Sequence, residues 1–176
     1  MQPAEIGRRA PGKRPASDRI ATLGAVRVLG VDLGSRRIGL AVSDEEGAFA
    51  FPAGILDSRG RKRDLAALRA LITEKKIGRA VVGLPIHMDG RRGPEAEKAI
   101  AFAADLSRSA GIPVDTLDER WTSQEAERLL QERPRTRGPE RRKSGIVDEM
   151  AASILLRTYL AQREAAESEP DAGERS

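Results

Sequence analysis

The sequence predicts an α/β layer fold built on a mixed sheet of five strands. Three apolar segments of strand length follow one another near the start, joined by short polar or glycine-containing connections. Helical and strand patterns then alternate, an order that is typical of layered folds with a mixed sheet. The chain has 176 residues, enough for a single domain with a sizeable core.

The first three strands are predicted at residues 26–33, 37–43 and 49–56. Their close spacing indicates a meander of antiparallel strands. We expect the strand at 26–33 to be central in the sheet. A ligand site would then lie near the carboxyl ends of strands.

A helix is expected over 61–76, where leucines recur at helical spacing. Asp57 and Ser58 stand just before it and offer an N-cap. A short strand of the buried type follows at 79–85 and ends at a proline. This segment begins the alternation of helices and strands.

A second helix is predicted from Pro94 to Gly111, because proline suits the first helical position. The fifth strand is expected at 112–117. After it, Thr122 and Glu125 have the spacing of a capping box and indicate a further helix start.

The folded domain is expected to span 25–162 and to end with a helix over 145–162. Residues 1–24 read as a disordered basic N-terminal extension, and 163–176 as a disordered acidic tail. Residues 133–143 combine prolines, a glycine and six basic side chains, which indicates a mobile basic loop.

Composition narrows the possible functions. The chain has no cysteine, which excludes disulfides, thiolate metal sites and a cysteine nucleophile, and suits a reducing, cytoplasmic location. It also has no apolar run long enough to cross a membrane and no signal-peptide pattern. The net charge is +4 and the sequence pI about 9.8, so a polyanionic partner is plausible.

Asp32 is the one acidic residue in the strand expected at 26–33, and the one charged residue on its face. Strand alternation places it on the same face as Val28 and Gly30, and the glycine leaves room beside it. A turn-capping role with Gly34 would explain the aspartate equally well. A bound cation is the functional alternative.

Two further acids, Asp118 and Glu119, fall where the fifth strand should end. Strand ends of α/β folds face the ligand crevice, although two solvated charges before a helix would give the same pattern. The sequence pattern leaves open which of the two acids faces the crevice.

Asp148 stands at the start of the last helix. At 100° per residue it shares a stripe with small and apolar residues: Ala151, Ala152, Leu155 and Tyr159. A carboxylate at the head of a buried stripe needs a cation, a hydrogen-bond network or a raised pKa. Bonding to backbone N–H groups in the first helical turn is the alternative.

Together, the three acids indicate a hard-oxygen metal site suited to Mg²⁺ or Mn²⁺. Two such ions, about 3.5–4 Å apart, can orient a water on one side of a phosphodiester and stabilise the leaving oxygen on the other.

The chain resembles the YqgF/RuvX family through four motifs in order: DLGSRRIGLAVSD, GLPIHMDGRRGPEAE, DERWTSQEAE and VDEMAASILLRTYL. The resemblance implies a ribonuclease H-like three-layer fold and an acidic triad at Asp32, Glu119 and Asp148, ranking Glu119 above Asp118. It also implies a nuclease that matures the 5′ end of pre-16S ribosomal RNA. The older family description is Holliday-junction resolvase.

Basic residues recur beside the expected site and indicate a nucleic-acid groove. The candidates for nucleic-acid binding are Arg36, Arg37, Arg91, Arg92, Arg120, Arg141, Arg142 and Lys143. We therefore expect a metal-dependent phosphodiesterase acting on structured RNA, such as precursor rRNA. Cleavage of branched DNA by a dimer and a non-catalytic role in RNA binding or transcription are the alternatives, and monomer or homodimer stays open.

Overall fold

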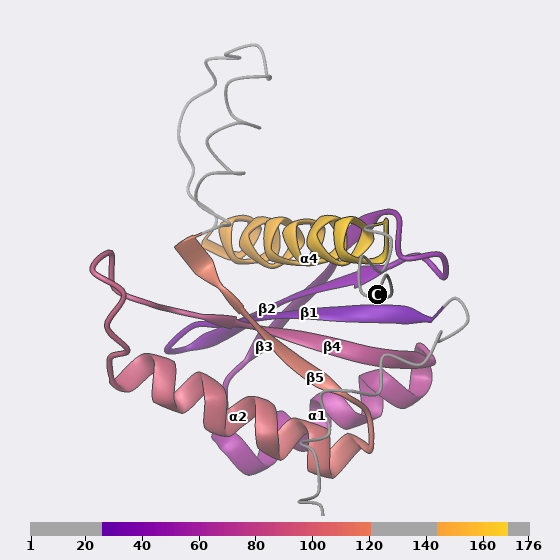
Figure 1. Ribbon diagram of the computed structural model, residues 1–176. Helices are drawn as coiled ribbons and strands as arrows, with labels where there is room; N and C mark the ends of the chain where they lie inside the picture. Colours follow the sequence, from indigo (N-terminus) through magenta and orange to yellow (C-terminus); the bar gives the residue numbers. More distant parts are fainter. Residues whose placement is uncertain (1–25, 121–143, 169–176) are drawn as a thin grey trace, which may run out of the picture.

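The computed structural model describes residues 26–120 and 144–168, the latter with side chains from Met150 onward. It contains a five-stranded sheet with helices on both faces (Figure 1). The strands are β1 (Arg27–Leu33), β2 (Arg37–Ser43), β3 (Ala50–Asp57), β4 (Ile77–Leu84) and β5 (Val114–Asp118). The helices are α1 (Arg61–Glu74), α2 (Pro94–Ala110) and α4 (Ser144–Ser168).

The strand order is β3-β2-β1-β4-β5, so β1 is central as predicted. Strands β1, β2 and β3 form an antiparallel meander, and β4 and β5 join β1 in parallel. This mixed sheet confirms the fold class and the five-stranded count. The strand boundaries agree with the prediction to within two residues, the largest shifts being at Ile77 and Val114.

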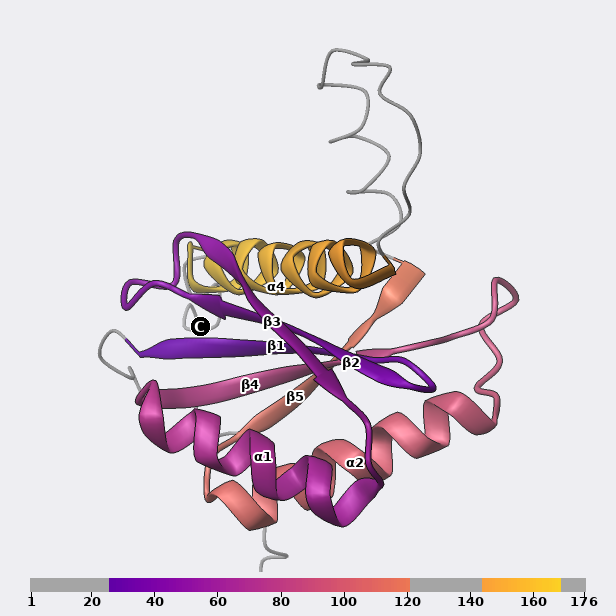
Figure 2. The ribbon, with the colours of Figure 1, turned by 180° about the vertical axis from the view of Figure 1, so that it is seen from behind.

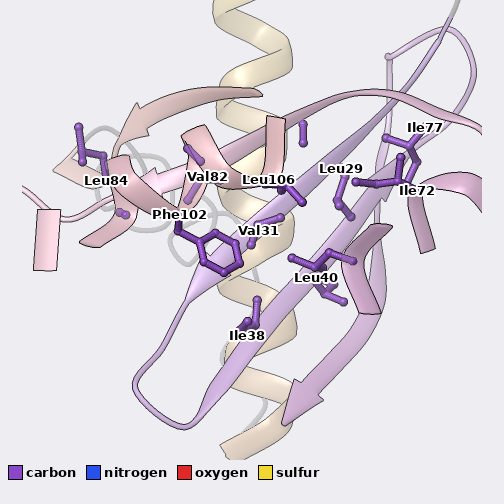
Figure 3. Packing of buried hydrophobic residues seen from close by; sticks show 14 of the residues in the cluster. Leu29, Val31, Ile38, Leu40, Ile72, Ile77, Val82, Leu84, Phe102 and Leu106 are labelled. Atoms are coloured by element: carbon purple, nitrogen blue, oxygen red, sulfur yellow. The ribbon is translucent and has the colours of Figure 1, made fainter. Parts of the chain in front are cut away.

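Two apolar layers hold the helices to the sheet. Helices α1 and α2 cover one face, where aliphatic side chains from the strands pack with Leu68, Phe102 and Leu106 (Figure 3). Helix α4 covers the opposite face, and its Ala152 and Leu156 are fully buried there (Figure 2). The sheet is thus the middle layer of three.

The start of α1 differs from the prediction. Its N-cap is Gly60, with a backbone φ of 99°, and neither Asp57 nor Ser58 caps it. Instead, the buried carboxylate of Asp64 accepts hydrogen bonds from the Ser58 hydroxyl at 2.7 Å and from the Arg59 N–H at 2.9 Å. The aspartate inside the helix therefore organises the preceding loop, the reverse of the expected capping.

The end of α4 also differs. The helix continues through Ser168, past the end predicted for it at residue 162. An Arg163–Glu167 ion pair at i,i+4 spacing supports the added turns. Helix α2 begins and ends as expected, with Gly93 as N-cap and Gly111 in the left-handed region. The capping box at 122–125 and the basic loop at 133–143 lie outside the described residues.

We define the carboxyl end of the sheet as the end where β1, β3, β4 and β5 finish and β2 begins. The first turn of α4 lies at this end, beside the arrowhead of β5 (Figures 1 and 2). At the opposite end, Leu160 lies close to Gly47 in the β2–β3 connection. Among the described residues, no helix has both the length and the apolar character needed to span a membrane.

Candidate active site at the carboxyl end of the sheet

Asp32 lies near the end of the central strand on the face covered by α4. Alternation along β1 places Val28 and Gly30 on that face, while Leu29 and Val31 enter the other core. A Cβ atom at Gly30 would stand 2.9 Å from Leu156 Cβ and 3.1 Å from the Ala152 carbonyl oxygen. The helix thus packs directly on the strand, and Asp32 follows as a half-buried carboxylate.

The turn after β1 is closed by backbone atoms. The N–H of Gly34 donates to the carbonyl of Arg37 at 2.9 Å, and a Cβ at Gly34 would lie 2.6 Å from that same oxygen. Only glycine fits this close approach. The glycine is therefore explained by the turn itself.

Glu119 directly follows β5 and lies over β4. Gly83 lies two positions after Val81 in β4, so both are on the sheet face that α4 covers. A Cβ at Gly83 would be 2.5 Å from Glu119 Oε1. Gly83 thus provides the space that the glutamate side chain occupies.

The surroundings of Glu119 raise the pKa of its carboxyl group to about 7. Burial is the main cause, and the charges of Asp32 and Asp118 add to it. Repulsion by Asp32 shows that carboxylates from β1 and β5 approach each other. Two nearby carboxylates repel each other when both are ionised, and a cation bound between them would offset this repulsion.

The carboxylate of Asp118 is hydrogen-bonded to its neighbour Arg120. Both of its carboxylate oxygens accept hydrogen bonds from the Arg120 guanidinium, at 2.6–3.1 Å, and the Arg120 N–H adds a bond at 3.0 Å. These bonds lower the pKa of Asp118. Of the two acids that the sequence left open, Glu119 is therefore the one that approaches Asp32. Arg120, a predicted phosphate contact, is tied to Asp118.

Asp148 belongs to the backbone of α4, one helical turn before Ala152, but its side chain lies outside the described residues. The helix position brings this segment to the carboxyl end of the sheet (Figure 1). Further along α4, the buried stripe contains Leu156 and Leu160, which the sequence analysis did not include. It contains Ala152 and Leu155 as expected.

The described residues fit a divalent ion in part. Asp32 and Glu119 would supply oxygen ligands, and Gly83 leaves the space in which Glu119 lies. Among the side chains that the structure describes, no group of three acids, histidines or cysteines gathers. The third ligand of the predicted triad would come from Asp148.

The predicted basic residues that the structure describes lie at this end of the sheet. Arg36 is exposed in the β1–β2 turn, and Arg37 Nε lies 3.9 Å from Asp57. Arg91 pairs with Asp89 at 2.6 Å, while Arg92 is exposed beside it. Arg141, Arg142 and Lys143 lie outside the described residues.

A partly buried polar network, which the sequence pattern did not predict, anchors α4 near its middle. The Tyr159 hydroxyl donates to Asp115 Oδ2, which also accepts a 2.7 Å bond from Arg79 Nη1. Burial, followed by the bond to Asp115, raises the pKa of Tyr159 to about 12. Strand alternation offered a signal, because Arg79 is a charged residue on the face of Val81.

The comparison with known families agrees with this architecture. Residues 26–162 match the family model described as "RuvX: Holliday junction resolvase". The chain belongs to the RuvX family. The match includes both acids that approach each other in the structure.

RuvX relatives named "Putative pre-16S rRNA nuclease" match along most of the chain. The protein from Anaeromyxobacter sp. strain Fw109-5 is 43% identical over 80% of this chain and 100% of its own length. The one from Anaeromyxobacter dehalogenans strain 2CP-C is 45% identical over 78% of this chain and 98% of its own.

A solved structure, "T. thermophilus RuvC in complex with Holliday junction substrate", has a similar fold. Its TM-score is 0.52 at 17% identity, and the match covers 78% of this chain and 96% of that one. The mixed sheet with its flanking helices is thus the fold of RuvC-like, ribonuclease H-like proteins. Family and fold together support nuclease function for this chain.

Proposed function

We propose that this RuvX protein is a metal-dependent endonuclease that hydrolyses a phosphodiester bond at the 5′ end of precursor 16S rRNA. The names of its relatives support the substrate. The observation that carries the chemistry is the approach of Asp32 to Glu119, a carboxyl whose pKa is raised mainly by burial and further by the charge of Asp32. A protein that only bound a polyanion would gain nothing from two adjacent carboxylates. The absence of cysteine suits action in the cytoplasm.

In the proposed mechanism, Asp32, Glu119 and Asp148 hold Mg²⁺ or Mn²⁺, with two ions as the expected number. When bound, such ions polarise the phosphate and activate water. Burial and the nearby charges of Asp32 and Asp118 raise the pKa of the Glu119 carboxyl to about 7, so it is partly protonated at neutral pH, and a bound cation would favour its ionised form. Exposed arginines, Arg36 and Arg92, hold flanking phosphates.

The decisive experiment replaces Asp32 by Asn and follows cleavage of a precursor 16S rRNA fragment with Mg²⁺ present. We expect loss of cleavage, because Asn removes the negative charge and one of the two ligand oxygens of the Asp32 carboxylate. The fold and most RNA binding should be retained, because the side chain keeps its size and shape. Asp118→Asn is the matched control: its carboxylate is bonded to Arg120, so cleavage should persist. Full activity of the Asp32→Asn variant would refute the proposed site.

Cleavage of branched DNA is the second candidate, because the matching family model is described as a Holliday junction resolvase. It would require a homodimer with two sites on opposed strands, whereas RNA processing also suits a monomer. Assaying one preparation on the rRNA fragment and on a four-way junction at equal salt discriminates between them. Cleavage of the junction alone would reassign the substrate.

A further inference from the structure

The loop between β3 and α1, together with the first turn of α1, presents a set of cations that the predicted site does not include. Arg59, Lys62 and Arg63 are exposed, and no residue in 26–120 or the described part of α4 forms an ion pair with them. Arg61 behaves differently. Its guanidinium pairs with Asp105 and donates to the Ala101 carbonyl at 2.7 Å, which ties it to α2.

These cations lie at the same end of the sheet as Asp32. The last residue of β3, Asp57, pairs with Arg37 at the start of β2. The Ser58 N–H donates to the Arg36 carbonyl at 3.0 Å, so the loop abuts the β1–β2 turn. The basic surface of that turn therefore continues onto α1.

Arg59 and Arg63 line one shallow surface depression of about 430 Å³. Leu56, Asp57 and Ala67 contribute to its walls. Asp57 also lies 3.9 Å from Arg37 Nε, so the depression borders the turn arginines directly. Arg59 and Arg63 are exposed there, and Asp57 and Asp64 also line the depression.

The basic residues in the first turn of α1 are unfavourable for the stability of that helix. The N-terminus of a helix carries a partial positive charge, so cations in the first turn are unfavourable there. Helix α1 nevertheless has Lys62 and Arg63 in its first turn and no basic residue in its last. The one acid in that turn, Asp64, is buried and accepts hydrogen bonds from the Ser58 hydroxyl and the Arg59 N–H. An anion bound at this surface would offset the unfavourable charges.

We propose that Arg59, Lys62 and Arg63 form a second phosphate-binding surface, which anchors the nucleic acid outside the cleaved bond. This inference rests on the proposed function only for the identity of the bound nucleic acid. Strand β3 lies two strands from β1, roughly 10 Å at the usual strand spacing, so the surface contacts phosphates other than the scissile one. It acts in affinity and orientation, not in the chemical step.

The test compares two triple variants, each built on Asp32→Asn so that the RNA stays intact. One changes Arg59, Lys62 and Arg63 to Gln. The matched control changes Arg69, Lys75 and Lys76 to Gln, three exposed or half-exposed cations of the same helix and its C-terminal cap, toward the other end of the sheet. Circular dichroism confirms that both fold.

Binding of the precursor rRNA fragment is measured between 50 and 200 mM salt. Each phosphate contact adds about 0.7–0.9 to the slope of log affinity against log salt, so the first variant should lose roughly 2–3 from this slope. We expect its affinity to fall by on the order of tenfold or more at 0.1 M salt, with the control close to the parent. Equal losses in both variants, or no loss in the first, would overturn the proposal.

Two further readouts separate the possible causes. If the wild type cleaves neither RNA nor the junction while the first variant still loses affinity, the proposed function fails and the binding surface stands. If the first variant keeps its RNA affinity but loses binding to phosphatidylserine vesicles, the surface recognises a membrane and our proposal is wrong.

Discussion

At the scale of single residues, the most informative group is the half-buried Glu119 carboxyl. Its pKa of about 7 means that the folded protein keeps a proton there which the unfolded chain loses near pH 4.5. Between these values the folded state binds more protons than the unfolded state, so the free energy of unfolding falls as pH rises. Above about pH 7 the carboxyl is ionised in both states, and the loss of unfolding free energy that its burial causes no longer changes with pH.

We therefore predict that Glu119→Gln stabilises the metal-free protein at pH 8 and has little effect at pH 4.5. The difference should be on the order of 1 kcal/mol, because solvent screens a carboxyl that is only half-buried. Urea unfolding in a chelator, repeated between pH 4.5 and 8, measures it. Parallel stability curves for the two proteins would contradict the burial of this charge.

Gly83 is the second residue whose role can be isolated. An added Cβ would meet Glu119 Oε1, the far end of a flexible side chain, so Gly83→Ala should displace the carboxylate at small cost in stability. We predict at least a tenfold loss of cleavage, consistent with the sensitivity of catalysis to misplacement of about 1 Å.

Gly78→Ala on the same strand is the control for this prediction. Its Cβ would collide with Val26, at the opposite end of the sheet from the site. It should lower the unfolding temperature and leave the cleavage rate of the folded protein unchanged. The reverse pattern for the two variants would show that Gly83 has no part in placing Glu119.

At the scale of elements, the contact of α4 with β1 determines where the site can form. We predict that Gly30→Ala costs about 1–3 kcal/mol of unfolding free energy, because its Cβ would enter the space of Leu156 and of the Ala152 backbone. Cleavage should fall as well, since α4 must shift away from the strand that carries Asp32. Unchanged stability would mean that the helix packs less closely than described.

Regular elements were predictable where one local signal determines them. Proline at the first position and glycine after the last residue located α2 correctly, because both act through their own backbone. The N-cap predicted for α1 at Asp57 or Ser58 was wrong. Local spacing favours a cap by these residues, whereas in the fold the Ser58 hydroxyl donates to the buried Asp64 carboxylate. The end of α4 was placed too early because exposed ion pairs extend a helix without an apolar signal.

At the scale of the whole molecule, strand alternation predicted the face of Asp32 but not its neighbours. Proximity to Glu119 depends on how β5 pairs with β4, a contact between distant segments that periodicity does not encode. Choosing Glu119 over Asp118 required the position of Gly83 and the bond to Arg120, which only the folded chain supplies. The Arg79–Asp115–Tyr159 network was missed for the same reason.

The position of α4 has a consequence for the order in which the molecule becomes active. It is the last described element along the chain, and it covers the apolar side chains of Val28, Val81 and Leu117. During synthesis the sheet segments emerge before this helix, so an apolar face stays bare until α4 docks. The proposed third carboxylate arrives with the same helix. Under the proposed function, a growing chain would therefore expose the arginines of the sheet end before its site is complete, and it would bind RNA before it could cleave it.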